Sequence, residues 1–401
     1  MVKIALLGYG TIGSGVAEVL RVNAETIAGR AGDAVEVKYI LDLRDFPGDI
    51  NEKKVVHDIH IILDDPEVSI VVEAMGGVEP AYTFTKNALL AGKSVTTSNK
   101  ALVAKHGAEL IRIARERNLS FMFEASVGGG IPIIRPMFTC MTANKIDEVT
   151  GILNGTTNYM MTKMSEEGSE FKDVLKEAQR KGFAEANPAA DIEGYDACRK
   201  IAILTSLASG KQVDFEDIPC EGITDITATD FKYAKALGRS IKLLATSKRV
   251  GDTYISLVAP FLLSPSHPLY PVSGVFNAIY VEGNTQGEMM FYGRGAGKLP
   301  TASAVVADIV DIIRHQGRNI LIQWSEEKLK LADSGRMKYR FLVRTVDTEE
   351  EIQAAFGKVE YVKAPCVSGE TAFVTEKMTG KAYEAAADKL GGVISRIRLF
   401  N

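Results

Sequence analysis

The stretch that decides the fold is Val2-Lys3-Ile4-Ala5-Leu6-Leu7-Gly8-Tyr9-Gly10-Thr11-Ile12-Gly13. Its continuous apolar run is typical of a strand buried on both faces, as in a parallel sheet. A glycine-x-glycine-x-x-glycine pattern follows at once, and residues 16–22 then show helical spacing. Gly8 permits a tight turn, Gly10 lets a pyrophosphate approach the backbone, and Gly13 allows the helix to pack on the strand. Because free N–H groups at a helix start attract anions, the pattern predicts a dinucleotide site. A glycine-rich turn in some other α/β protein is the alternative.

Strand-like and helix-like segments alternate along the chain up to about residue 125. The predicted strands cover residues 35–41, 70–74, 94–97 and 119–123, with helices at 80–91 and 108–117. This alternation predicts a doubly wound parallel sheet of the Rossmann type, in a dinucleotide-binding domain at 1–133.

The pattern changes after Glu124-Ala125-Ser126-Val127-Gly128-Gly129-Gly130. Strand-like runs at 146–155 and 254–290 are separated by long helical stretches, which predicts a mixed α+β domain at 134–299. A strong helix at 302–314 is expected to pack back on the first domain, which it would join as a segment at 300–316.

The last part of the chain has the pattern of a small module. Residues 325–333 are charged and predict a linker. Residues 338–401 then show a strand, a helix, two strands, a helix and a short strand, an order that is typical of a ferredoxin-like fold. We place this module at 335–401, which gives an α/β protein of three parts.

Composition excludes several classes of protein. The 401 residues carry a formal net charge of -4, whereas a nucleic-acid-binding protein usually has a basic face. No apolar run reaches the roughly 18 residues of a membrane span, and the first apolar run is too short for a signal peptide. Cys140, Cys198, Cys220 and Cys366 are far apart and lack metal-type spacing, so we expect reduced thiols in a cytoplasmic protein.

Two charged residues follow the second predicted strand. Asp42 could accept hydrogen bonds from an adenosine ribose and favour NAD, whereas Arg44 could pair with a 2′-phosphate and favour NADP. Both could equally be solvated loop charges, so the choice between the two cofactors stays open.

Two lysines are candidates for the chemistry. Lys100, in Ser98-Asn99-Lys100, follows the strand at 94–97, at the end where ligands bind in parallel sheets. By itself it would be interpreted as a surface lysine, and Lys105 is a weaker candidate. Asp196 and Lys200 are four residues apart and share one face of an apolar helix. A lysine held there could have the depressed pKa that proton transfer near neutral pH needs, although solvated pairs of this spacing are common.

Seven ordered segments together resemble one family, homoserine dehydrogenase, over nearly the whole chain. They are residues 8–13, 98–100, 124–132, 151–159, 182–200, 222–227 and 291–302. The resemblance implies an NAD- or NADP-dependent oxidoreductase that interconverts L-homoserine and L-aspartate 4-semialdehyde, in threonine, methionine and isoleucine biosynthesis. The segment from Gly182 to Lys200 is the most specific of the seven.

The resemblance also implies a role for particular residues. Lys200 would exchange the proton at the reacting oxygen, Lys100 would share that role, and Asp196 would orient Lys200 or a water. The substrate would be bound by Glu185, Asp191, Gly155 and Thr156. The cofactor would be bound by Gly8, Gly10, Thr11, Ile12, Gly13, Arg44, Ser98, Lys100 and Gly295. A monovalent cation, usually sodium in this family, would be held by oxygens of Glu124, Val127, Gly129 and Ile131. A homodimer or higher homo-oligomer would form through the second domain.

The end of the chain departs from the family pattern. Family members often end in a regulatory ACT domain, whose first strand runs into an aspartate, a proline and a glycine. Here the strand at 339–347 runs into Thr348-Glu349-Glu350-Glu351. We therefore expect an ACT-like fold that does not bind threonine in the usual way, with a purely structural or dimer-strengthening module as the alternative.

Two competing hypotheses follow from the same glycine loop. An aspartate-semialdehyde dehydrogenase would need a nucleophilic cysteine, and neither Cys140 nor Cys198 has an obvious base partner in the sequence. A non-catalytic nucleotide sensor would have no use for Lys100 and Lys200.

Overall fold

The first sheet of the computed structural model, which describes residues 1–400, confirms the doubly wound arrangement. All of its strands are parallel, in the order β3-β2-β1-β4-β5-β6. They are β1 (Val2–Leu7), β2 (Val35–Leu41), β3 (Val55–Val56), β4 (Val68–Glu73), β5 (Ser94–Thr97) and β6 (Phe121–Met122). The helices of this part are α1 (Thr11–Val22), α2 (Ala24–Ala31), α3 (His60–Leu63), α4 (Ala81–Leu90) and α5 (Lys100–Glu116). Asn401, the end of the expected C-terminal module, lies outside the described residues.

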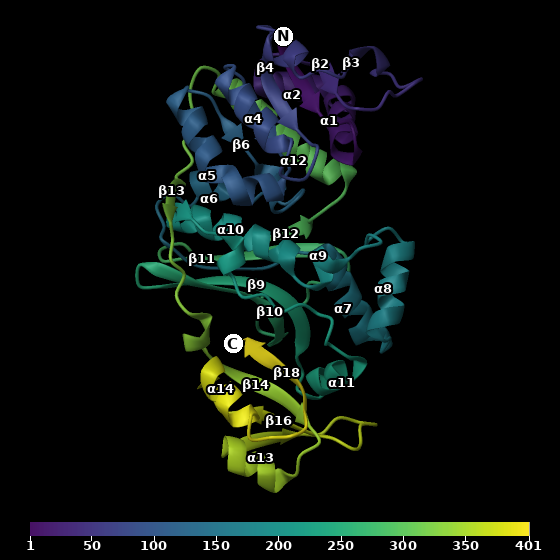
Figure 1. Cartoon of the computed structure of the whole chain (residues 1–401), viewed down its shortest axis with the longest axis vertical. Helices are drawn as coiled ribbons and strands as arrows, with labels where there is room; N and C mark the ends of the chain where they lie inside the picture. Colours follow the sequence, from purple (N-terminus) through teal and green to yellow (C-terminus); the bar gives the residue numbers. More distant parts are fainter. Residues whose placement is uncertain (401) are drawn as a thin grey trace.

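The helix expected at 302–314 does return to this sheet. It is α12 (Lys298–Arg314), and it packs against α1 and α2 although it lies far along the chain (Figure 1). Gly15 of α1 makes the approach possible, because a Cβ there would lie 3.0 Å from the carbonyl oxygen of Lys298. Asp308 of α12 is fully buried and accepts hydrogen bonds from the Thr96 hydroxyl and the Glu124 backbone N–H.

The second sheet is mixed, as expected, and runs in the order β12-β11-β7-β9-β10-β18-β14-β16-β15. Its first strands are β7 (Ile146–Ile152), β9 (Ser240–Val250), β10 (Thr253–Leu263), β11 (Phe276–Gly283) and β12 (Gly287–Arg294). The helices that go with them are α6 (Ile134–Thr139), α7 (Gly155–Glu167), α8 (Phe171–Arg180), α9 (Ala189–Ile192), α10 (Tyr195–Ser209) and α11 (Ala228–Ala236). The sequence did not predict β9, because it is buried on both faces over most of its length and shows no alternation.

The C-terminal residues continue this same sheet. They form β14 (Lys338–Thr345), α13 (Glu349–Phe356), β15 (Val359–Val362), β16 (Thr371–Thr375), β17 (Met378–Thr379), α14 (Gly380–Ala387) and β18 (Val393–Phe400). The expected order of strands and helices is present with two differences: the two-residue strand β17 precedes the second helix, and the last strand is not short, since it has eight residues and pairs in parallel with β10. The stretch expected to be a linker also contains a short strand, β13 (Ser325–Lys328), which pairs with β8 (Lys211–Gln212).

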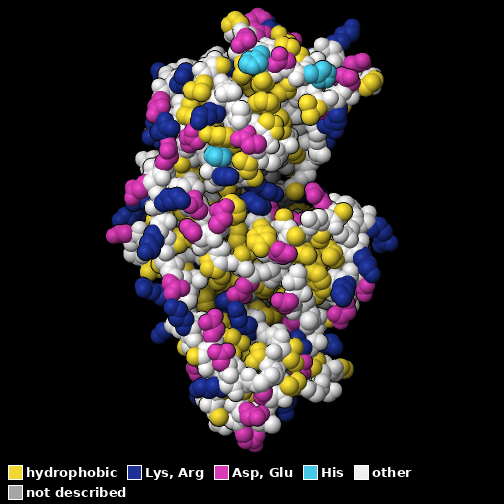
Figure 2. All heavy atoms as spheres, viewed as in Figure 1, with side chains coloured by type: hydrophobic (Ala, Val, Ile, Leu, Met, Phe, Trp, Pro, Cys, Tyr) yellow, Lys and Arg dark blue, Asp and Glu magenta, His cyan; other side chains and the backbone are white. Residues whose placement is uncertain are grey.

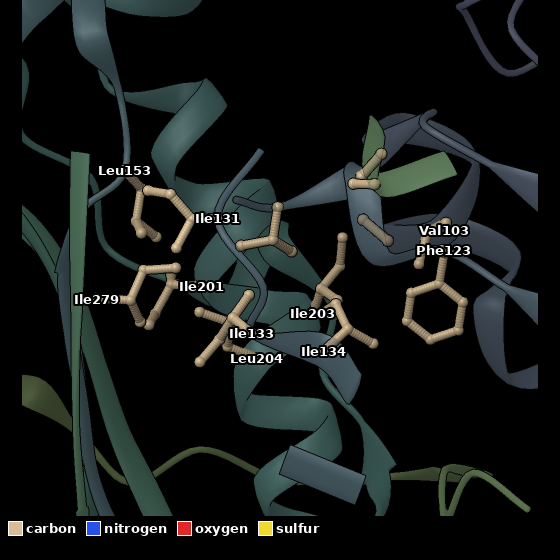
Figure 3. Close-up of a cluster of buried hydrophobic side chains, with 14 of the residues drawn as sticks. Val103, Phe123, Ile131, Ile133, Ile134, Leu153, Ile201, Ile203, Leu204 and Ile279 are labelled. Carbon is tan, nitrogen blue, oxygen red and sulfur yellow. The ribbon is translucent and has the colours of Figure 1, made fainter. Parts of the chain in front are cut away.

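Helix α10 lies at the centre of the molecule, between the two sheets. It packs against α5 and α6 on one side and against β7, β9 and β10 on the other. Figure 3 shows the result, a continuous row of buried side chains from Ile279 of β11 through Ile201 and Leu204 of α10 to Val103 of α5. This helix is therefore held by strands of the second sheet on one side and by α5 and α6 on the other. None of the helices in residues 1–400 combines the length and apolar character needed to cross a bilayer.

Candidate active site

The glycine loop has the geometry that its sequence predicts. Gly8 has a φ of 93°, a value that favours glycine, and its N–H donates to the carbonyl of Leu41 at 2.8 Å. A Cβ on Gly13 would lie only 2.0 Å from the carbonyl oxygen of Gly8, so this residue must be glycine for α1 to pack on β1. Gly10 has open space around it and caps α1 without a side chain. The first N–H groups of α1 are therefore left to an external acceptor such as a pyrophosphate.

A cleft of about 620 Å³ extends from this loop across the carboxyl ends of β2 and β4. We call it the cofactor cleft; its lining includes Gly8, Gly10, Asp42, Arg44, His57 and Met75. One Asp42 oxygen accepts the N–H of Tyr9 at 2.8 Å, and the Arg44 guanidinium binds both oxygens at 2.9 and 3.0 Å. The hydrogen bond from Arg44 lowers the pKa of Asp42 to about 2. Asp42 thus supports the glycine loop, while Arg44 stays largely exposed at the rim of the cleft.

A buried network that the sequence did not reveal fixes the edge of the cleft. Glu73, at the end of β4, is fully buried and accepts the Met75 N–H at 2.8 Å and the Thr97 hydroxyl at 2.5 Å. Asn99 caps α5 by accepting the Leu102 N–H at 3.1 Å. Its amide also donates to the carbonyl of Gly77 at 2.6 Å, so the loop after β4 and the start of α5 are held together. Ser98 lies beside them, half-buried.

The two candidate lysines meet at one carboxylate. Asp196 and Lys200 are both buried in α10, and the Lys200 ammonium donates to Asp196 Oδ2 at 2.8 Å and to the Leu153 carbonyl at 2.7 Å. Lys100, the first residue of α5, forms an ion pair with Asp196 Oδ1. Its side chain is 42% exposed, in contrast to 10% for Lys200. Asp196 therefore contacts two lysines, the buried Lys200 of its own helix and the more exposed Lys100 of α5.

Asn154 completes what we call the lysine–carboxylate cluster: Lys100, Asn154, Asp191, Asp196 and Lys200. The sequence prediction omitted Asn154, although it lies in a segment that carries the family resemblance. Its amide donates to Asp191 at 2.7 Å and to Asp196 at 2.9 Å, while its carbonyl caps α7. An asparagine just before a predicted helix would have indicated the cap, but not the two carboxylates.

The cluster shifts the acidity of its members in opposite directions. Burial lowers the pKa of Lys200 despite the neighbouring Asp196. Burial alone would raise the pKa of Asp196, but Lys200 and Lys100 outweigh it and hold that pKa below its usual range. Burial raises the pKa of Asp191. The arrangement thus provides an amine that can lose its proton beside a carboxylate that stays charged.

The other predicted substrate residues surround the cluster less tightly. Gly155 begins α7, and a Cβ there would lie 2.8 Å from the carbonyl oxygen of Val275. The hydroxyl of Thr156 donates to the carbonyl of Phe183 at 2.6 Å, which ties the loop between α8 and α9 to α7. Glu185 is exposed on that loop, and within residues 1–400 no hydrogen bond or ion pair engages its carboxylate. Figure 2 shows a notch between the N-terminal part and the part that carries α7 and α8, with acidic and basic side chains at its inner end.

The four predicted cation positions lie on a buried loop at 124–131. The Glu124 carboxylate does not face a cavity: it accepts the N–H groups of Ile133, Ile134 and Arg135 at 2.6, 2.8 and 2.7 Å and so caps α6. Both of its side-chain oxygens therefore already have backbone partners. The backbone fits better: Val127, Gly129 and Ile131 are buried residues, and in the described residues no hydrogen bond ends on their carbonyl oxygens.

The glycine-rich turn after β12 lies against this loop. A Cβ on Gly129, whose φ is 57°, would lie 2.3 Å from the carbonyl oxygen of Gly295. The N–H of Gly130 donates to the carbonyl of Arg294 at 3.2 Å. Gly295 itself packs on Asn277, whose amide nitrogen would lie 2.1 Å from a Cβ. The predicted cofactor residue Gly295 therefore touches the predicted cation loop directly.

Comparison with known proteins identifies the family. Residues 8–124 match the profile described as "Homoserine dehydrogenase, NAD binding domain", and residues 132–310 match "Homoserine dehydrogenase". This chain belongs to the homoserine dehydrogenase family. A homoserine dehydrogenase of Synechocystis sp. is 45% identical over 321 residues, which is 78% of this chain and 73% of that relative.

Solved homoserine dehydrogenases share the fold. A crystal structure from Thiobacillus denitrificans matches with a TM-score of 0.90 at 35% identity and covers 100% of this chain and 98% of its own. A hyperthermophilic archaeal homoserine dehydrogenase in complex with NADPH matches with a TM-score of 0.67 at 29% identity, over 78% of this chain and 97% of that one. Homoserine dehydrogenases are NAD(P)-dependent oxidoreductases, in agreement with the dinucleotide site predicted from the glycine loop.

Proposed function

We propose that this chain interconverts L-homoserine and L-aspartate 4-semialdehyde, a step of threonine, methionine and isoleucine biosynthesis. The observation that carries the proposal is the buried Lys200, whose pKa is lowered and whose ammonium is aimed by Asp196 and the Leu153 carbonyl. Those two acceptors use two of its three N–H groups, so the third is left for a substrate oxygen. A bound nicotinamide would accept the hydride from the alcohol carbon.

The proton from the substrate hydroxyl would go to neutral Lys200 in the oxidation and return from the Lys200 ammonium in the reduction. Lys100 is exposed enough to exchange protons with solvent, and it reaches the same carboxylate from the cofactor side. Asp196 keeps both amines in place, since it contacts both and stays charged. These three residues are our candidates for proton transfer and its positioning.

The amino group of homoserine would be recognised by carboxylates. Asp191 is oriented by Asn154 within the cluster, and the Glu185 carboxylate on the adjoining loop has no hydrogen bond or ion pair in residues 1–400. Gly155 and Thr156 lie at the start of α7, next to Asn154, and would leave room for the substrate. A substrate ammonium would gain ion pairs that a simple alcohol lacks, which supports selectivity for an amino acid.

The dinucleotide would lie along the cofactor cleft, with its pyrophosphate on Gly10, Thr11 and Ile12 at the start of α1. Asp42 would accept a ribose hydroxyl of NAD, whereas Arg44, turned from Asp42, would bind the 2′-phosphate of NADP. The archaeal relative in complex with NADPH supports a cofactor of the NADP type. Gly8, Gly13, Ser98 and Gly295 would shape the remaining wall.

A monovalent cation, sodium in the first instance, would bind the free carbonyl oxygens of the 124–131 loop, with the backbone oxygen of Glu124 as the fourth position. It would stiffen the contact between this loop and Gly295 and so act on cofactor binding. Its role is structural in this proposal, and no proton passes through it.

We infer three domains, at 1–133 with the helix 300–316, at 134–299 and at 335–401. The last has the strand order β18-β14-β16-β15, which supports an ACT-like fold. Dimerisation through the second domain and a cytoplasmic location complete the proposal; the four cysteines are all free thiols, as a reducing compartment maintains them.

Turnover with L-homoserine and NAD or NADP, followed through the absorbance of the reduced cofactor, tests the proposal. Activity on a phosphorylated aldehyde without homoserine oxidation would overturn it in favour of aspartate-semialdehyde dehydrogenase. Of the two cysteines considered for that alternative, Cys198 is poorly suited to be its nucleophile, because hydrogen bonding to Cys220 and burial raise the pKa of its thiol.

A further inference from the structure

The segment Pro219–Ile223 contacts both the C-terminal strand β18 and the turn that precedes the catalytic helix α10. On one side it lies along β10, because the Glu221 N–H donates to the Val258 carbonyl at 2.8 Å and the Val258 N–H donates to the Pro219 carbonyl at 3.0 Å. Its position is therefore fixed by the middle of the second sheet.

The opposite side of this segment packs against the turn between α9 and α10, residues 192–194. The Ile223 N–H donates to the Ile192 carbonyl at 2.8 Å, and the Cys220 thiol donates to the Glu193 carbonyl at 3.0 Å. Gly222 fits so closely that a Cβ would lie 2.3 Å from the Ile192 oxygen. This turn separates Asp191 from Asp196, so its position sets the spacing of the two carboxylates in the lysine–carboxylate cluster.

Glu221 fixes the segment to β18 through two arginines. Arg398 binds both of its carboxylate oxygens at 2.6 and 2.7 Å, and Arg396 does so less closely, at 3.1 and 3.4 Å. The Arg398 side chain is only 12% exposed. Burial alone would raise the pKa of Glu221, but the two arginines outweigh it and keep this carboxylate charged. A bidentate arginine defines direction as well as distance, so β18 restrains the segment in a single orientation.

We propose that Glu221, held by Arg398 and Arg396, is a positioning residue for substrate binding, through which the C-terminal strand sets the spacing of Asp191 and Asp196. This inference rests on the proposed function, since it assumes that the cluster binds and turns over homoserine. It predicts that loss of the Glu221 pairs changes the KM for homoserine while the KM for the dinucleotide stays as it is, because the cofactor cleft is built on the first sheet.

Five variants of the full chain test the inference: E221Q, R398M, R398K, R396M and R340M. R340M is the matched control, because Arg340 pairs with Glu360 at 2.8 Å inside the same C-terminal part and is not hydrogen-bonded to the 219–223 segment. We expect the KM for homoserine to rise about tenfold in E221Q, slightly less in R398M and least in R396M, with R340M unchanged. R398K, which keeps the charge but not the bidentate geometry, is expected to recover part of the loss.

The outcomes separate the inference from the function it rests on. Absence of homoserine oxidation by the wild-type chain would overturn both. Normal wild-type turnover with equal homoserine KM in E221Q and R340M would overturn the inference alone, as would an equal rise in the dinucleotide KM. If R398M does not fold, the KM of R396M for homoserine tests the inference, because R396M removes only the longer pair and keeps the bidentate one. A homoserine KM equal to that of R340M would then overturn it.

Discussion

The cofactor cleft is formed mainly by backbone groups, whereas the lysine–carboxylate cluster is formed by side chains. The cleft depends on backbone: a left-handed Gly8, a contact at Gly13 that tolerates no Cβ, and the free N–H groups of α1. The cluster depends on side chains, since four charged groups and one amide are gathered from α5, α9, α10 and the turn before α7. We therefore expect substitutions that remove a charge to impair catalysis at the cluster, and substitutions that add volume to impair cofactor binding in the cleft.

The largest effect is expected for Lys200→Met, which removes the buried amine and keeps most of its volume. Without a group to exchange the hydroxyl proton, kcat for homoserine oxidation should fall about 10³-fold. Cofactor affinity, measured by fluorescence titration with NADPH, should not change, because Lys200 contacts Asp196 and Leu153 and not the cofactor cleft. Turnover close to the wild-type rate would show that Lys100 or a water exchanges the proton instead.

Asp196→Asn should come next, because it leaves two lysines without their shared counter-ion. We expect kcat to fall about 10²-fold and the free energy of unfolding to drop by about 3 kcal/mol. Since the pKa of folded Asp196 lies below its unfolded value near 3.9, the carboxylate stabilises the fold above about pH 4.

That stabilisation should be lost as pH falls through the folded pKa. Urea unfolding at a series of pH values should therefore show the difference between wild type and Asp196→Asn shrinking below about pH 4. A difference that stays constant down to acid pH would mean that Asp196 does not carry the charge assigned to it.

A smaller effect is expected for Gly13→Ala, which tests the cleft by volume. The new Cβ would lie 2.0 Å from the Gly8 carbonyl oxygen, so α1 must move away from β1. The KM for the dinucleotide should rise about tenfold, while kcat at saturating cofactor stays within about twofold. Gly29→Ala is the matched control, since Gly29 lies in α2 with open space around it. Equal KM values in the two variants would contradict the role given to the glycine loop.

The sequence predicted most of the cleft because its signals are local. The apolar run of β1 and the glycines after it are adjacent in the chain, so the strand, the turn and the helix follow from one stretch. The same is true of Asp196 and Lys200, whose spacing of four residues determines that they meet on α10. Where partners are close in sequence, residue types alone were enough.

What the sequence could not predict are contacts that only the assembled fold creates. Lys100 meets Asp196 because α5 and α10 pack together, and Asn154 joins two carboxylates that lie 37 and 42 residues ahead of it. Glu124 was predicted only as one of four positions whose oxygens hold a cation, and nothing in the sequence indicated that its carboxylate accepts three N–H groups at the start of α6. Strand β9 was missed for a related reason, as burial on both faces removes the alternation that marks a strand.

The smallest effect is expected for Arg44→Ala, which tests whether a charged side chain of the cleft selects between NAD and NADP. The side chain is 63% exposed and its pair with Asp42 is a surface pair, so the free energy of unfolding should change by less than about 0.5 kcal/mol. If Arg44 turns from Asp42 to a 2′-phosphate, the KM for NADP should rise by about tenfold and the KM for NAD should not. Because Asp42 also accepts the Tyr9 N–H, its removal would disturb the glycine loop for both cofactors, so Asp42→Ala is the informative counterpart. Equal changes for NAD and NADP in Arg44→Ala would mean that Arg44 serves only as the counter-ion of Asp42, and that the cleft, unlike the cluster, selects its ligand through backbone alone.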